Sequence, residues 1–519
     1  MSMFLRASRL KSIKLLVLPK RFYVVESGRG TNTKKGLLLG CYEEDDSNGF
    51  KLSDTAQRLD DSLCGRISEL IKGSDLSKGK CLIFNNLSND YHAVAVAGLG
   101  PKNAGFNEAE NLDEFRENIR VATGLGVQKL QESNVNQIAV EGFSNSEAAA
   151  EGAVLGAWQY EELKNPEEQS VPVAVELDGW QRGMYRAEAQ NIARKLSECP
   201  ANLMTPSIFA TNAIELLCPL GINVDVRDKD WIEVKKMNAF LSMARGSCEP
   251  PLFLEIGYTG GSNQERPIVM VGKGVTFDSG GLCLKRCEDM MEHRGDMAGA
   301  AAIVGVFMAI AQMKLPINVR ALIPLCENMP GGMAMKPGDV VLGMNGKSIR
   351  IENTDNDGRV IMADALAFSQ NLRPKMLIDV ATLTGGIRRA LGSSCSGVFT
   401  TSDDIWQGLS RAGALTGDRV WRFPLWKHFT HKVTDYNGVD VSNVGRGTGG
   451  DPCLGAAFLM EFVPPCVDFC HIDITGTGLT AGGVGYPYLR KGYMTGRPTR
   501  TLIQFLCQLA CPRENSGVD

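Results

Sequence analysis

Acidic and basic side chains in the C-terminal half of this sequence have the types and spacing of a cation-binding centre. They lie in three short segments, as Lys273, Asp278 and Lys285, then Asp296, then Asp355 and Asp357. Like charges gathered at one place repel one another, and divalent cations would offset that repulsion. Carboxylate ligands suit hard or borderline ions such as Mg²⁺, Mn²⁺ and Zn²⁺. The pattern therefore predicts a divalent-metal centre in which carboxylates are the main ligands, because the sequence has only five histidines and no His-Glu-x-x-His pair.

Taken singly, each of these side chains has an ordinary structural explanation. Asp296 could be a helix N-cap and Asp355 a turn residue, while a lone lysine such as Lys273 is usually solvated at the surface. The glycines around Lys273 lack the spacing of a phosphate loop, which argues against a nucleotide-binding module. Only the convergence of the whole group favours a metal centre.

The elements that must position these residues are predicted to form a mostly parallel sheet with helices on both faces. Helices are expected over Asp296–Met313 and Arg359–Leu372. Apolar strands are expected at Pro267–Val271, Val319–Leu325, Met376–Val380 and Phe469–Ile474. Strands that alternate with helices favour parallel pairing, and ligands gather at the carboxyl ends of such strands. We therefore expect the metal-binding side chains at three strand ends of one sheet.

The preceding part of the chain also alternates short strands with helices. The predicted strands are Lys80–Asn85, His92–Ala97 and Gln137–Glu141, and the predicted helices are Asp54–Lys72, Glu108–Leu130, Ser146–Leu163 and Asp178–Ser197. The fold class is thus α/β, with a smaller N-terminal α/β domain and a larger C-terminal α/β domain built on a central, mostly parallel sheet. The expected boundaries are 1–31 for a targeting segment, 32–185 for the N-terminal domain, 186–206 for a linker helix and boundary, and 207–519 for the catalytic domain.

The composition of the chain limits the classes of binding partner to expect. The chain has 519 residues, a net charge of −4 and a pI of about 5.9, which give no reason to expect nucleic acid or an anionic membrane as a partner. The fifteen cysteines, such as Cys218 and Cys326, are expected to be reduced and buried. Two clusters could offer zinc ligands, namely Cys283 with Cys287, and Cys466 with Cys470 and His471. Neither has Cys-x-x-Cys spacing, so core packing is favoured for both.

The N-terminal segment has the composition of a mitochondrial transit peptide. Residues 1–25 carry six basic side chains and several hydroxyls, and no acid precedes Glu26. Basic residues interrupt its apolar positions, which argues against a secretory signal. The alternative is a basic tail on a cytoplasmic protein.

Four motifs make the sequence similar to the leucyl aminopeptidase (cytosol aminopeptidase) family. They are Gly272–Gly281, Asn353–Arg359 with the following Ala363–Leu366, Asp379–Gly385, and Tyr488–Arg500. The similarity runs from about residue 190 to 508, and the preceding domain is consistent with the family's N-terminal domain. The resemblance implies a homohexamer that removes N-terminal residues from peptides with two divalent metal ions per subunit, Mn²⁺ or Zn²⁺ or, as a further candidate, Mg²⁺.

The resemblance also implies roles for individual residues. The metal ligands would be Lys273, Asp278, Asp296, Asp355 and, in the bridging position, Asp357. Lys285 would be the catalytic lysine, and Arg359 would hold a bicarbonate that acts as general base. The substrate-binding residues would be His293, Thr382 and Leu383.

Two positions depart from the family pattern. Asp357 stands where the family has a bridging glutamate, so its carboxylate falls short by roughly 1 Å, a misplacement that can cost on the order of a hundredfold in rate. His293 stands where the family usually has a methionine, which makes the pocket more polar. The sequence therefore leaves two hypotheses open, an active aminopeptidase and a weakly active or inactive paralogue that serves as a hexameric structural or binding protein.

Overall fold

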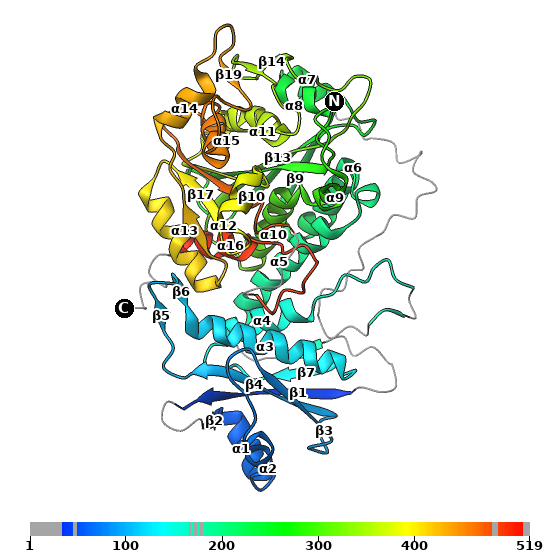
Figure 1. Ribbon diagram of the computed structural model, residues 1–519, viewed down its shortest axis with the longest axis vertical. Coiled ribbons are helices and arrows are strands. Elements are labelled where there is room, and N and C mark those ends of the chain that lie inside the picture. The colour runs from blue at the N-terminus through cyan, green and yellow to red at the C-terminus, as the bar shows by residue number, and fades with distance from the viewer. Residues whose placement is uncertain are drawn as a thin grey trace.

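A computed structural model describes residues 34–44, 49–165, 168–170, 174–176, 180–479 and 486–511. The described residues form two α/β units, each built on its own sheet (Figure 1). The predicted fold class is thereby confirmed. The targeting segment expected at 1–31 lies outside the described residues, and the predicted domain boundaries stay predictions.

The N-terminal sheet has parallel strands at its centre. Its strand order is β3 (Cys81–Asn85), β4 (Ala93–Pro101), β1 (Lys35–Glu43), β7 (Gln137–Val140) and β8 (Ala174–Glu176), with β2 (Phe50–Leu52) paired to β1. Strands β4, β1, β7 and β8 run parallel, while β2 and β3 are antiparallel to their neighbours. Successive residues of β1 point to opposite faces, so Leu38 packs towards α3 (Glu114–Glu132) and α4 (Ser146–Ala157), and Leu39 packs towards α1 (Asp54–Ser62) and α2 (Arg66–Ile71).

Three predicted helices in this unit have different bounds in the structure. The predicted helix Asp54–Lys72 is two helices, because Cys64 and Gly65 adopt left-handed backbone conformations with φ of 54° and 80°. The predicted helix from Glu108 begins only at Glu114, where Asp113 accepts a hydrogen bond from the backbone N–H of Arg116. The third ends at Ala157, because the next residue has an extended backbone.

The C-terminal sheet is mixed. Its strand order is β18 (Val420–Arg422), β17 (Ser396–Thr400), β20 (Asp468–Asp473), β16 (Met376–Ala381), β11 (Ile268–Gly272), β13 (Asn318–Asn328), β10 (Leu252–Thr259) and β9 (Asn223–Arg227), with β12 (Gly274–Asp278) paired to β13. Strands β20, β16, β11 and β13 are parallel, as predicted, whereas β17 and β10 run antiparallel to the strands they flank. The parallel centre brings the carboxyl ends of β11 and β16 to one edge.

Helices cover both faces of this sheet (Figure 1). One apolar core lies under α5 (Gln181–Glu198), α6 (Pro206–Leu217), α10 (Ala298–Gln312), α13 (Asp403–Thr416) and α16 (Thr499–Ala510). The other lies under α7 (Lys229–Val234), α8 (Asn238–Ala244), α11 (Asp357–Phe368) and α15 (Asp451–Met460). The remaining short elements are α9 (Cys287–Met290), α12 (Gly385–Leu391), α14 (Lys427–Thr434), β5 (Phe106–Asn107), β6 (Leu112–Asp113), β14 (Val340–Leu342), β15 (Ser348–Arg350) and β19 (Val441–Ser442).

A buried ionic cluster joins the two units. Glu151 of α4 forms ion pairs with three arginines, at 2.6 Å to Arg120, 2.6 Å to Arg186 and 2.9 Å to Arg500. Burial alone would raise the pKa of Glu151, but the three guanidinium groups hold it well below its usual range. A buried charge stripped of such partners is strongly destabilising, so the cluster specifies how α4, α5 and α16 pack.

One stretch, Cys287–Gln312, has the length and apolar composition of a membrane-spanning helix. Within its most apolar window 89% of the residues are buried inside the fold, and α10, which makes up most of it, is covered by α5 and α16. A core helix of this kind passes the same test of composition.

The cysteines are only partly buried. Cys326 and Cys470 are buried as predicted, but Cys218, Cys287 and Cys466 are exposed, which corrects the expectation that the cysteines pack as core residues. Their positions at a helix end or in loops, outside the strands, explain the difference.

Candidate metal centre

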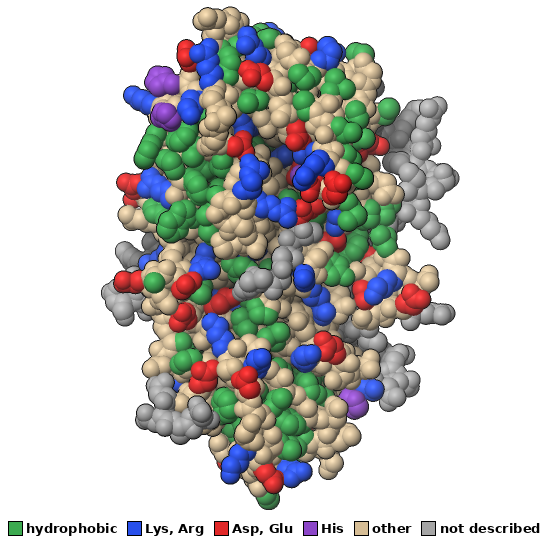
Figure 2. Space-filling model, in the orientation of Figure 1, with side chains coloured by type: hydrophobic (Ala, Val, Ile, Leu, Met, Phe, Trp, Pro, Cys, Tyr) green, Lys and Arg blue, Asp and Glu red, His purple; other side chains and the backbone are tan. Residues whose placement is uncertain are grey.

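The predicted metal-binding residues come together at one edge of the C-terminal sheet. Lys273 directly follows β11, Asp278 ends β12, and Asp296 precedes α10. Asp355 and Asp357 reach the same place from the start of α11, which follows β15 of a separate three-stranded sheet. The expectation of three strand ends in one sheet is therefore wrong for Asp355 and Asp357, although both converge on the site. In Figure 2, acidic and basic side chains gather near α9 and α12 on this part of the molecule.

Lys273 is the buried cation at the centre. Its Nζ lies 3.6 Å from Asp357 Oδ1 and 3.7 Å from Asp296 Oδ2. The same Nζ donates a hydrogen bond to the carbonyl oxygen of Thr382 at 3.1 Å. Burial alone would lower the pKa of Lys273, but the surrounding carboxylates outweigh it and raise this pKa above its ordinary value.

Lys285 is the second cation. Its Nζ lies 2.9 Å from Asp278 Oδ2 and also pairs with Asp355 Oδ1. Asp278 is oriented through its other oxygen, which accepts hydrogen bonds from Gly280 N and Asn328 Nδ2, each at 2.8 Å. Asn328 was not predicted as a site residue. Its position at the end of β13, beside Asp278 at the end of β12, could have identified it.

Burial disfavours the charged form of each buried carboxylate in the site. Burial and the nearby charge of Asp357 raise the pKa of Asp278, and burial raises the pKa of Asp357. For Asp296, burial is outweighed by Lys273 and His293, which hold its pKa far below the usual range. Asp357 is 1% exposed, and among the described residues its Oδ2 has no hydrogen-bond partner. A buried carboxylate oxygen without a partner is costly, so the site fits a further positive charge.

The donor set fits a divalent metal ion. One ligand atom from each of Asp278, His293 and Asp296 lies within 4.8 Å of the other two. The amine of Lys273 and the unpartnered oxygen of Asp357 adjoin this group. Carboxylates with an amine or imidazole nitrogen suit borderline ions such as Zn²⁺ and also Mn²⁺.

Arg359 is buried on α11, with 1% of its surface exposed. Its Nη1 donates to the carbonyl oxygen of Asn443 at 2.9 Å, and its Nη2 pairs with Asp451 Oδ1 at 2.5 Å. Burial lowers the pKa of Arg359 from its usual value. The protein's own acceptors therefore occupy the outer nitrogens expected to hold a bicarbonate. Asp451 was not predicted as a site residue, because it lies 92 positions away from Arg359 in the chain.

The predicted substrate residues line a cavity of about 410 Å³ above this centre. His293, Thr382 and Leu383 share its wall with Lys273, Lys285 and three of the predicted aspartate ligands, Asp278, Asp296 and Asp355. Asp357 and Arg359 are not among its lining residues. Asp473 fixes the wall segment by accepting hydrogen bonds from Leu383 N at 3.3 Å and Thr384 Oγ1 at 2.6 Å. Sequence reasoning missed Asp473, which ends β20 beside β16.

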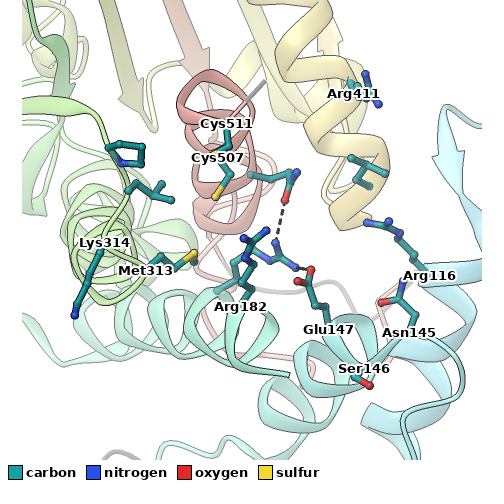
Figure 3. A pocket seen from close by; sticks show the side chains of 15 residues that line it. Arg116, Asn145, Ser146, Glu147, Arg182, Met313, Lys314, Arg411, Cys507 and Cys511 are labelled. Atoms are coloured by element: carbon teal, nitrogen blue, oxygen red, sulfur yellow. Dashed lines mark hydrogen bonds and ion pairs between the residues drawn. The ribbon is translucent and has the colours of Figure 1, made fainter. Parts of the chain in front are cut away.

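A second cavity, of about 540 Å³, lies where α3, α4, α5, α13 and α16 meet (Figure 3). Its central charge is already satisfied, because Arg186 pairs with Glu147 at 2.7 Å and donates to Gln504 at 2.9 Å. Among the described residues Glu147 is the one carboxylate in its lining. The converging carboxylates of a metal centre belong to the first cavity.

His471 and Cys470 do not form a zinc site with Cys466. His471 and Cys470 are buried on β20, where His471 Nδ1 pairs with Asp379 Oδ1 at 2.5 Å, while Cys466 is exposed. Core packing is thus confirmed for Cys470, but it is wrong for Cys466 and Cys287.

Comparison with known proteins gives one consistent match. Residues 191–503 match the family described as "Cytosol aminopeptidase family, catalytic domain", and residues 38–167 match the N-terminal domain of that family. The "Cytosol aminopeptidase" of Bos taurus is 46% identical over 484 residues, covering 91% of this chain and 92% of the relative. That of Xenopus tropicalis is 44% identical over 501 residues, covering 94% and 96%. The solved structure "Bottromycin maturation enzyme BotP in complex with Mn" aligns with a TM-score of 0.76 and 30% identity, covering 92% of this chain and 100% of that one.

Proposed function

Because the chain belongs to the cytosol aminopeptidase family, as its motifs predicted, we propose that it removes N-terminal residues from peptides at the cavity above Lys273. The observation that carries the proposal is the convergence of Lys273, Lys285 and four aspartates, one of which, Asp357, keeps an unpartnered oxygen. The family is one of aminopeptidases, which hydrolyse peptide bonds.

The proposed cofactors are two divalent ions per subunit, Mn²⁺ or Zn²⁺, with Mg²⁺ as a further candidate. The residues that would hold them are Lys273, Asp278, Asp296, Asp355 and Asp357. Support comes from the group of carboxylate and nitrogen donors beside Lys273 and from the manganese complex of the similar BotP. Such a metal pair acidifies a water molecule and polarises the scissile carbonyl.

The side chains of this chain supply the remaining steps. Lys285, held between Asp278 and Asp355, presents its ammonium group to the cavity, where it stabilises the negative charge that develops on the carbonyl oxygen. Lys273 would ligate a metal ion only as a neutral amine, and nearby cations would favour the loss of its proton to solvent. Thr382 and Leu383 border the substrate, and Asp473 orients the backbone of Leu383.

A bicarbonate on Arg359 is the proposed general base. Its binding requires Nη2 to be released by Asp451, whose side chain is 40% exposed and also lines the cavity. Asp451 can turn towards solvent at little cost in free energy, since water replaces most of the stabilisation that an exposed carboxylate gains from an ion pair. Asp451 thus competes with bicarbonate for the same guanidinium group.

A second function, a weakly active or inactive paralogue that serves as a hexameric structural or binding protein, is favoured by one observation. Asp357 is a methylene shorter than the glutamate implied by the family motif, and the two lysines already pair with four of the carboxylates. The two lysines offset two of the four carboxylate charges, so this alternative predicts a site that binds metal without turnover.

Assembly and location extend the proposal. The family resemblance supports a homohexamer, six chains of 56.3 kDa or about 340 kDa in total, which light scattering would measure. The basic N-terminal segment supports a mitochondrial protein rather than a cytoplasmic one. Sequencing of the native N-terminus tests this, since a native protein that starts at Met1 or Ser2 would contradict cleavage.

The decisive experiment for the activity is hydrolysis of leucine amide with added Mn²⁺ or Zn²⁺, together with a metal count per subunit by mass spectrometry. Turnover with close to two bound metals supports the aminopeptidase. Bound metal without turnover at any metal concentration supports the inactive paralogue instead.

A further inference from the structure

His293 lies within reach of the metal centre rather than only on the wall of the substrate cavity. Its Nδ1 is 2.9 Å from Asp296 Oδ2, and one ring nitrogen of His293 lies within 4.8 Å of a carboxylate oxygen of Asp278 and of Asp296. Two donors on one ion with bonds of about 2.0–2.2 Å lie roughly 3–4 Å apart. Small side-chain rotations therefore bring all three onto one cation.

The turn that carries His293 is anchored on both sides. Glu292, before it, pairs with Arg388 of α12 at 2.7 Å. Arg294, after it, pairs with Glu198 of α5 at 2.6 Å. These contacts hold the backbone of His293 between two helices, and a ligand held in this way loses little conformational freedom when it binds.

Asp278 and Asp296 each keep an oxygen on the His293 side. Asp278 Oδ1 is used by Gly280 N and Asn328 Nδ2, which leaves Oδ2 towards the cavity beside Lys285. The oxygen of Asp296 that meets His293 is the one that faces Lys273. An ion between these two carboxylates would thus meet the imidazole from one side and Lys273 from another.

We propose that His293 is a nitrogen ligand of the metal ion that Asp278 and Asp296 bind, and that it biases this position towards Zn²⁺ over Mg²⁺ and Mn²⁺. The inference rests on the proposed metal-dependent function. Imidazole nitrogen favours zinc, whereas magnesium and manganese prefer oxygen ligands.

The test is pulsed electron paramagnetic resonance of the full-length protein loaded with Mn²⁺. A directly bound imidazole nitrogen gives a nuclear modulation that a hydrogen-bonded histidine at longer range does not. We expect the imidazole component of the modulation, which is separate from that of the Lys273 amine, in the natural protein and its loss in His293→Met. The matched control His428→Met, which changes an exposed histidine, should retain it.

Metal affinity gives the second readout. Chelator competition should show Zn²⁺ binding at least about tenfold weaker in His293→Met, because loss of even a supporting contact to a ligand costs that much. The affinity for Mg²⁺ should change less. His293→Gln serves in place of the methionine variant if the latter does not fold.

The outcomes separate the two proposals. Metal bound by the natural protein without the imidazole modulation, or with equal Zn²⁺ affinity in the natural protein and His293→Met, overturns the role of His293 and leaves the aminopeptidase proposal intact. Failure of the natural protein to bind any of the three metals overturns both.

Discussion

Lys273 Nζ lies 3.6 Å from Asp357 Oδ1, while Asp357 Oδ2 has no hydrogen-bond partner among the described residues. One oxygen of this carboxylate is therefore satisfied by an ammonium group, and the other is buried and free to accept a cation. Asp357 begins α11, where the helix dipole also favours a negative charge. The length of this one side chain decides how far that oxygen reaches into the site.

Asp357→Glu should restore the reach of the carboxylate. We expect tighter metal binding and a rise in leucine amide hydrolysis of up to about a hundredfold, since a misplacement of about 1 Å can cost that much. Titration calorimetry and kcat/KM measure the two effects. Asp357→Asn, which keeps the size and removes the charge, should weaken metal binding; a glutamate variant that behaves like the natural protein would place the limitation elsewhere.

Lys285→Met should lower kcat by about a hundred- to a thousandfold at saturating metal, because it removes the group that stabilises the developing oxyanion. The metal count should stay near that of the natural protein, since Lys285 is not a ligand. The neighbouring Arg286→Met is the control, because among the described residues the ion-pair partner of Arg286 is Asp289 and the Arg286 side chain is 79% exposed. Equal kcat in the two variants would exclude the catalytic role of Lys285.

Asp451→Asn should make bicarbonate activation easier. The variant loses the charge that pairs with Arg359 Nη2 at 2.5 Å, so half-maximal activation should need less bicarbonate. Rates measured across a bicarbonate series at constant pH test this. Arg359→Lys should abolish the bicarbonate dependence, because an ammonium group cannot bind a planar oxyanion through two nitrogens as a guanidinium group does. Activation by bicarbonate that persists in this variant would contradict the assignment of Arg359.

Glu188→Gln should stabilise the fold at neutral and alkaline pH. Burial on α5 raises the pKa of Glu188 from 4.5 to about 7. The folded protein therefore binds a proton more tightly than the unfolded chain, and stability falls as pH rises from 4.5 to about 7. The shift corresponds to about 3 kcal/mol above pH 7, most of which the neutral variant should recover.

Urea unfolding at pH 8 and at pH 4.5 provides the measurement and its internal control. The two proteins should differ at pH 8 and agree closely at pH 4.5, where Glu188 is protonated in the folded state. A difference of the same size at both pH values would show that the substitution acts through packing rather than through charge.

Local patterns predicted the parts of the site that depend on one segment. Lys273 and Asp278 were placed at strand ends from the apolar run before them and the glycines around them, and the structure places both there. The parallel centre of the larger sheet also followed from the alternation of strands and helices. Helix ends were harder to predict. The break between α1 and α2 depends on the left-handed backbone of Cys64 and Gly65, which the spacing of apolar residues does not indicate.

The family, the α/β class and the residue types of the site could all be predicted from the order of the residues, because side-chain identity and local periodicity are properties of the sequence. Which charged groups come into contact depends on the three-dimensional packing. Arg359 and Asp451 are 92 positions apart, and the closeness of His293 to Asp278 depends on where a short turn is anchored to α5 and α12. Electrostatic and coordination energies depend on distances of a few ångströms, and only the packed chain sets those distances.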